Sequence, residues 1–66
     1  MQVILNGENR QFEDSLSIAA LLEQTGLRGK RIAVEVNETI VPRSLHGETL
    51  VSEGDKIEII HAIGGG

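Results

Sequence analysis

The chain has 66 residues, with 10 Asp and Glu against 6 Lys and Arg, a formal net charge of -4 and no cysteine. This charge opposes nucleic-acid binding, which usually requires clustered Lys and Arg to neutralise phosphates. Phe12 is the single aromatic residue, so bases have no stacking platform. The absence of cysteine excludes disulfides and thiolate chemistry within the chain.

The length predicts one domain without a deep pocket. Apolar residues make up 39% of the sequence, and a chain this short needs almost all of them for one core. No stretch approaches the roughly 18 to 20 apolar residues of a membrane span, and no secretion signal opens the chain. We therefore expect a cytoplasmic, non-catalytic domain that binds neither membranes nor nucleic acid.

The chain begins with the pattern of a β-hairpin. The run from Met1 to Leu5 is rich in strand-forming residues, and Asn6-Gly7 follows it. This dipeptide favours the positive φ angles of a tight turn. A second strand is expected at about 10–12.

A helix is predicted to start after Ser17, which is placed to cap its first turn. Leu16 and Leu21 have the spacing of a hydrophobic staple across that start. Gly26 is expected to end the helix in the left-handed conformation, so that Leu27 packs back on the last turn.

The second half of the chain predicts a second hairpin and a final strand. Residues 32–36 alternate with period two, and Asn37-Glu38 leads into a short strand at 39–41. The turn Glu53-Gly54-Asp55 precedes a final strand from Lys56. The first and last strands are the most apolar, which favours their lying side by side at the centre of an α+β sheet with one helix across one face.

The sequence ends in Gly64-Gly65-Gly66, directly after the strand-like run 56–63. Glycine has no Cβ, so an extended tail of this kind can enter a passage too narrow for other residues. An ionised terminal carboxylate can attack the α-phosphorus of ATP if a partner supplies a metal ion and cationic groups. We therefore expect a folded domain at 1–63 and a flexible, reactive tail at 64–66. The alternative is a frayed chain end or the remnant of an expression tag.

The two histidines are weak candidates for acid-base catalysis, because a general base needs a partner group and a pocket. We expect His46 to lie in a loop and His61 to lie near the end of the last strand, with no catalytic role for either. The acidic side chains are expected to form a solvated surface.

A docking surface is predicted beside the tail. If Ile57 and Ile59 face the helix, then Ile60 and Ala62 point to the opposite face of the sheet, and Ile4 should join them there. Exposed apolar side chains in that position suit contact with a partner protein. The alternative is that they only cover a small sheet.

Several segments together resemble the ThiS family of sulfur carrier proteins in thiamine biosynthesis. They are the ββαββ order, the strand Ala33–Asn37, the segment Ile40–Arg43, the turn Glu53–Asp55 and the terminal Gly-Gly. The resemblance spans the whole chain. It implies a ubiquitin-like β-grasp fold, with a mixed sheet of four to five strands, one main helix and a flexible Gly-Gly tail.

The resemblance also implies a protein substrate rather than an enzyme. An E1-like enzyme of the ThiF type would use ATP to adenylate the Gly66 carboxylate, and a system including a cysteine desulfurase would supply sulfur for a thiocarboxylate. The carrier would then deliver sulfur to a thiazole synthase of the ThiG type. Gly65 is the second residue of the motif, and Gly64 is a spacer. No bound cofactor or metal is implied, and the carrier alone is expected to be monomeric.

Two other functions fit the same tail. The small subunit of molybdopterin synthase uses a similar thiocarboxylate, whereas a ubiquitin-like modifier would join its tail to a lysine. The short chain and the Ile40–Arg43 segment favour the thiamine carrier.

Overall fold

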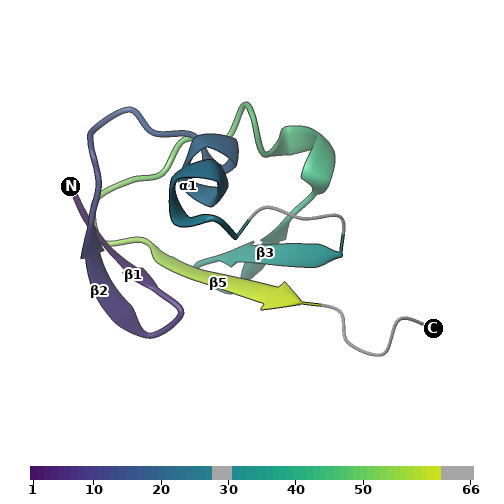
Figure 1. Cartoon of the computed structure of the whole chain (residues 1–66), viewed down its shortest axis with the longest axis horizontal. Helices are drawn as coiled ribbons and strands as arrows, with labels where there is room; N and C mark the ends of the chain where they lie inside the picture. Colours follow the sequence, from purple (N-terminus) through teal and green to yellow (C-terminus); the bar gives the residue numbers. More distant parts are fainter. Residues whose placement is uncertain (28–30, 62–66) are drawn as a thin grey trace.

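The computed structural model describes residues 1–27 and 31–61, which form a five-stranded mixed sheet with one helix across one face (Figure 1). Within these residues, no helix is long and apolar enough to cross a membrane. The elements are β1 (Gln2–Leu5), β2 (Glu8–Gln11), α1 (Ile18–Thr25), β3 (Ile32–Val36), β4 (Thr39–Val41), a 3-10 turn (Arg43–Leu45) and β5 (Lys56–His61).

The strands lie in the order β2-β1-β5-β3-β4, so β5 occupies the centre of the sheet. It runs parallel to β1 and antiparallel to β3, while the outer strands close antiparallel hairpins. The prediction that the first and last strands are neighbours is confirmed. The central position means that β5 has a pairing partner along both of its edges.

Both hairpins have tight turns led by asparagine. Asn6 and Gly7 have φ angles of 50° and 84°, and Asn37 and Glu38 have φ angles of 51° and 69°. Two successive positive φ angles are the signature of a type I′ turn, whose twist matches that of the flanking strands. The first turn returns the chain at once to Glu8, opposite Leu5, so β2 starts two residues earlier than the predicted 10–12.

The predicted ends of the helix are confirmed. The Ser17 hydroxyl accepts a hydrogen bond from the Ala20 N–H at 3.1 Å, which satisfies a donor that the first turn leaves free. Gly26 has a φ angle of 73°, and the Leu27 N–H donates to the Leu22 carbonyl at 3.0 Å. This is a Schellman cap, and it returns partly buried Leu27 to the core.

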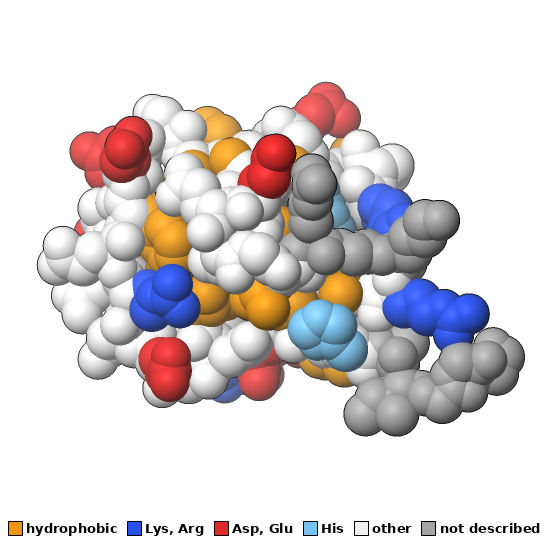
Figure 2. All heavy atoms as spheres, viewed as in Figure 1, with side chains coloured by type: hydrophobic (Ala, Val, Ile, Leu, Met, Phe, Trp, Pro, Cys, Tyr) orange, Lys and Arg blue, Asp and Glu red, His pale blue; other side chains and the backbone are white. Residues whose placement is uncertain are grey.

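One hydrophobic core lies between α1 and the sheet. On the surface, Figure 2 shows hydrophobic side chains in a broken band across the middle of the view, with acidic groups above and below it. Burying a large aliphatic side chain fully contributes about 1.5 to 3 kcal/mol before entropy losses. The buried members are Val3, Leu5, Leu16, Ile18, Leu21, Leu22, Val34, Val51, Ile57 and Ile59.

The segment between the 3-10 turn and β5 runs beside α1 on the same side of the sheet (Figure 1). The Ile18 N–H donates to the Thr49 carbonyl at 2.9 Å, and the Val51 N–H donates to the Leu16 carbonyl at 2.8 Å. Because these bonds use backbone groups on both sides of the helix start, they hold α1 over the strands.

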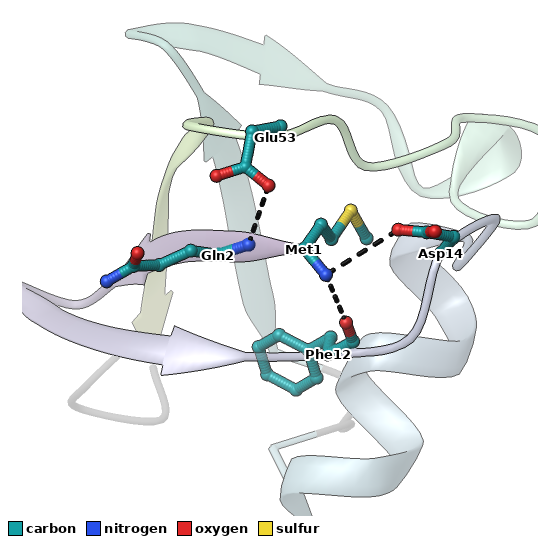
Figure 3. A network of polar contacts seen from close by, with 5 residues as sticks. All are labelled: Met1, Gln2, Phe12, Asp14 and Glu53. Carbon is teal, nitrogen blue, oxygen red and sulfur yellow. Dashed lines mark hydrogen bonds and ion pairs between the residues drawn. The ribbon is translucent and has the colours of Figure 1, made fainter.

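The start of the chain is tied into the sheet by the contacts in Figure 3. The Met1 α-amino group donates to the Phe12 carbonyl at 2.7 Å and lies 3.5 Å from the exposed carboxylate of Asp14. The Gln2 N–H donates to Glu53 Oε1 at 3.0 Å. The Met1 contacts connect the start of the chain to the residues that follow β2, and the Gln2 bond connects the start of β1 to the turn that precedes β5.

Candidate functional site

The described part of the candidate site is the end of β5, the strand that leads to the terminal glycines. Ile57 and Ile59 are 0% and 7% exposed on the helix side, whereas Ile60 is 49% exposed. The predicted alternation along this strand is therefore confirmed. Ala62 and the predicted tail residues, Gly64, Gly65 and Gly66, lie outside the described residues, as does the boundary predicted at residue 63.

Asn6 holds β5 from the β1 side. Its N–H donates to the Ile57 carbonyl at 2.9 Å, and its Oδ1 accepts from the Ile59 N–H at 2.8 Å. The sequence identified Asn6 as a turn residue and gave no sign of this second contact. The two bonded residues Asn6 and Ile59 are 53 positions apart in the chain, so no local pattern could have revealed the bond.

Asn37 holds the other end of β5 from the β3 side. Its N–H donates to the Lys56 carbonyl at 2.7 Å, and its Oδ1 accepts from the Lys56 N–H at 3.0 Å. Its Nδ2 also donates to Asp55 Oδ1 at 2.9 Å. The first residue of β5 is thus fixed by both the backbone and the side chain of one asparagine.

The sheet face opposite α1 carries Ile4 and Ile60, which were predicted to form a docking surface. Ile4 is 38% exposed and pairs with Lys56, so it lies level with position 56 of β5 and four residues from Ile60. At the rise of a β-strand, that offset is about 13 Å. The two isoleucines therefore share a face but are not adjacent. The neighbour of Ile60 on β3 is Ala33. A docking role for Ile4 and Ile60 stays a prediction.

Two carboxylates interrupt the apolar side chains of this face. Glu35 on β3 pairs directly with Glu58 on β5, and both side chains are partly exposed. Ile40 on β4, 63% exposed, lies on the other side of Glu35. Because like charges directly opposite each other repel, a basic side chain from a partner would be favourable here.

His46 lies in a turn between β4 and β5, as predicted, but it is not a surface residue. It is 8% exposed, its Nε2 lies 3.0 Å from the Val41 carbonyl, and its own carbonyl accepts from the Ala19 N–H at 2.9 Å. It is a packing residue that joins β4 to the start of α1. His61 lies at the end of β5, as predicted, where it is exposed and pairs with Ile32.

Residues 1–27 and 31–61 contain no pocket. The same residues bring together no group of three His, Asp or Glu side chains that could hold a metal ion.

The chain is a ubiquitin-like β-grasp domain, because its mixed five-stranded sheet carries one helix across one face, as in solved β-grasp structures. The crystal structure of the thiamine biosynthesis protein ThiS from Geobacter metallireducens has a TM-score of 0.89 at 28% identity, and the match covers all of both chains. The ThiS family model matches residues 3–66, and the chain belongs to the ThiS family.

Relatives of very different lengths match the whole chain. The sulfur carrier protein ThiS of Escherichia coli K12 is 33% identical over 66 residues, and the match covers all of both proteins. The thiazole synthase of Paramagnetospirillum magneticum is 44% identical over 66 residues, but the chain spans only 20% of that protein's length. A segment similar to this chain thus occurs within a larger thiazole synthase.

Proposed function

We propose that the chain is a sulfur carrier of thiamine biosynthesis, in which the Gly66 carboxylate is the group that carries sulfur. The main support is the match to the sulfur carrier protein ThiS of Escherichia coli over the full length of both proteins. A Gly-Gly end that follows the central strand of the sheet gives the chain a suitable group for this task.

The proposed reaction has two steps. The Gly66 carboxylate attacks the α-phosphorus of ATP and releases pyrophosphate, which leaves an acyl adenylate. A hydrosulfide ion, which a thiol reductant releases from the persulfide of a cysteine desulfurase system, then displaces AMP, and the product is a thiocarboxylate. Both steps build up negative charge, so an E1-like enzyme of the ThiF type supplies the metal ion and the cationic side chains.

The sulfur acceptor in this proposal is a thiazole synthase. Support comes from the thiazole synthases of Paramagnetospirillum magneticum and Magnetococcus marinus, which contain segments 44% and 38% identical to this chain. Fusion of a carrier to its acceptor raises the local concentration of one at the other. A separate carrier and a fused carrier can therefore serve the same transfer.

The activating enzyme docks, in this proposal, on the sheet face around Ile60. Ala33 extends the apolar surface beside Ile60, and the Glu35–Glu58 pair offers negative charge to a basic side chain of the partner. Ile4 is a separate contact about 13 Å away along the sheet. Ala62 belongs to the same proposal as the residue that follows β5 in the sequence.

Intact mass spectrometry tests the proposal. After incubation with ATP, a ThiF-type enzyme and a sulfur source, the mass should rise by the difference between sulfur and oxygen. The Gly65→Val variant should show no gain and an unchanged melting temperature, because a β-branched residue widens and stiffens the tail. The Escherichia coli carrier serves as the positive control.

An unchanged mass, in a reaction where the control carrier gains sulfur, would overturn the proposal. Covalent addition to lysines of other proteins would favour the modifier function instead. Sulfur transfer to a molybdopterin synthase large subunit, but not to a thiazole synthase, would favour the molybdenum cofactor pathway.

A further inference from the structure

The two edges of β5 are supported to different lengths. On one edge, β3 pairs with β5 as far as His61, opposite Ile32. On the other edge, in the part of the chain that the structure describes, pairing with β1 stops at Ile57 (Figure 1). Beyond Ile57, the edge of β5 that faced β1 therefore needs another hydrogen-bond partner, and the end of β5 that leads to the glycines depends on it.

The side chain of Asn6 is that partner. The Ile4 N–H donates to the Asp55 carbonyl, and the Asn6 N–H donates to the Ile57 carbonyl, each at 2.9 Å. In a parallel pair, the next bond would run from the Ile59 N–H to the main-chain carbonyl of residue 6. Asn6 has a φ angle of 50° and has already begun the turn. Its side-chain Oδ1 accepts the Ile59 N–H instead, at 2.8 Å.

We propose that Asn6 is a positioning residue for the reactive tail. By accepting the Ile59 N–H, it fixes the backbone of β5 just before Ile60 and His61. It thereby sets the direction in which the chain continues toward Gly66. The inference builds on the proposed sulfur carrier function, because a direction matters only if the tail must reach a partner's active site. Misplacement of a reacting group by about 1 Å can slow a reaction by roughly a hundredfold.

Asn37 provides a matched control. It also leads a type I′ turn, has a φ angle of 51°, and accepts a β5 amide through Oδ1. The amide that it binds belongs to Lys56, at the opposite end of β5 from the tail. Replacement of either asparagine by glycine keeps the left-handed backbone accessible and removes one acceptor. Asn6→Gly removes the bond to Ile59, near the end of β5 that leads to the tail, whereas Asn37→Gly removes the bond to Lys56 at the start of β5.

The experiment compares Asn6→Gly, Asn6→Asp and Asn37→Gly with the unmodified chain. Amide hydrogen exchange, followed by NMR, should accelerate at Ile59 in Asn6→Gly and stay slow there in Asn37→Gly. Thiocarboxylate formation at saturating carrier should fall in Asn6→Gly by roughly tenfold with little change in KM, and remain within about twofold of the unmodified rate in Asn37→Gly. Asn6→Asp retains an acceptor oxygen and should restore both slow exchange and rate.

Unaltered exchange at Ile59 in Asn6→Gly would overturn the inference, as would an unaltered rate. An equal loss of rate in Asn37→Gly would also overturn it, because general loosening of the sheet would then explain the result. Failure of the unmodified chain to gain sulfur would overturn the proposed function instead. In that case the exchange at Ile59 would still decide whether Asn6 holds this end of β5.

Discussion

The two faces of β5 differ although they belong to one six-residue strand. Ile57 and Ile59 are buried beneath α1, whereas Glu58 and Ile60 lie on the open face of the sheet. The buried face supplies contacts that every folded copy of the chain must make. The open face makes few such contacts, so its residues can be selected for binding a partner. Because side chains alternate along the strand, residues that stabilise the fold are direct neighbours of residues that can bind a partner.

The largest expected effect comes from the buried face. Ile57→Ala should lower the free energy of unfolding by about 2 to 5 kcal/mol, because it removes three carbons from a residue with no exposed surface. Chemical denaturation measures this loss. A loss below that range would mean that the core at Ile57 can collapse around the cavity.

An intermediate effect is expected on the open face. Ile60→Ala should weaken binding to the activating enzyme by about 1 to 2 kcal/mol, as for a contact near the centre of an interface. The melting temperature should change little, since Ile60 is already 49% exposed. Calorimetric titration measures the affinity. A variant that melts as early as Ile57→Ala yet binds normally would show that the two faces are not divided in this way.

The smallest effect concerns the carboxylate pair between Ile60 and Ile40. Glu35→Gln should raise the free energy of unfolding by about 0.2 to 1 kcal/mol, because it removes a like-charge pair directly across two strands. The gain should shrink at high salt, where exposed charges are screened. Denaturation at low and high salt tests both statements.

The same substitution also tests the proposed interface. Loss of the negative charge should reduce the association rate with a partner that presents a basic side chain. A Glu35→Gln variant that is more stable and also binds faster would exclude a basic contact at this point.

Much of the fold could be predicted because its signals are local. The Asn6-Gly7 turn, the Ser17 cap and the Gly26 cap each depend on the conformational preferences of one or two residues. The helix and all five strands follow from such signals combined with hydrophobic periodicity. The start of β2 was placed late because its polar residues, all exposed, carry no periodicity.

The candidate site was harder to predict because its features are not local. The register that sets Ile4 opposite Lys56 arises from packing between strands far apart in the sequence. His46 is buried where the turn that follows β4 meets the first turn of α1. The bond between Asn6 and Ile59 requires the completed β1–β5 pair. The sequence indicated the tail, but only the fold reveals what orients the strand leading to it.

The central position of β5 has a consequence for how the protein is made. A nascent chain that ends before Lys56 has two hairpins, β1–β2 and β3–β4, with no strand to join them. The sheet can close only after β5 has been synthesised and has paired with both. Chains that stop before β5 therefore lack both the fold and the glycines. Because the terminal glycines follow β5 in the sequence, the sheet can form only when synthesis has proceeded almost to the end of the chain.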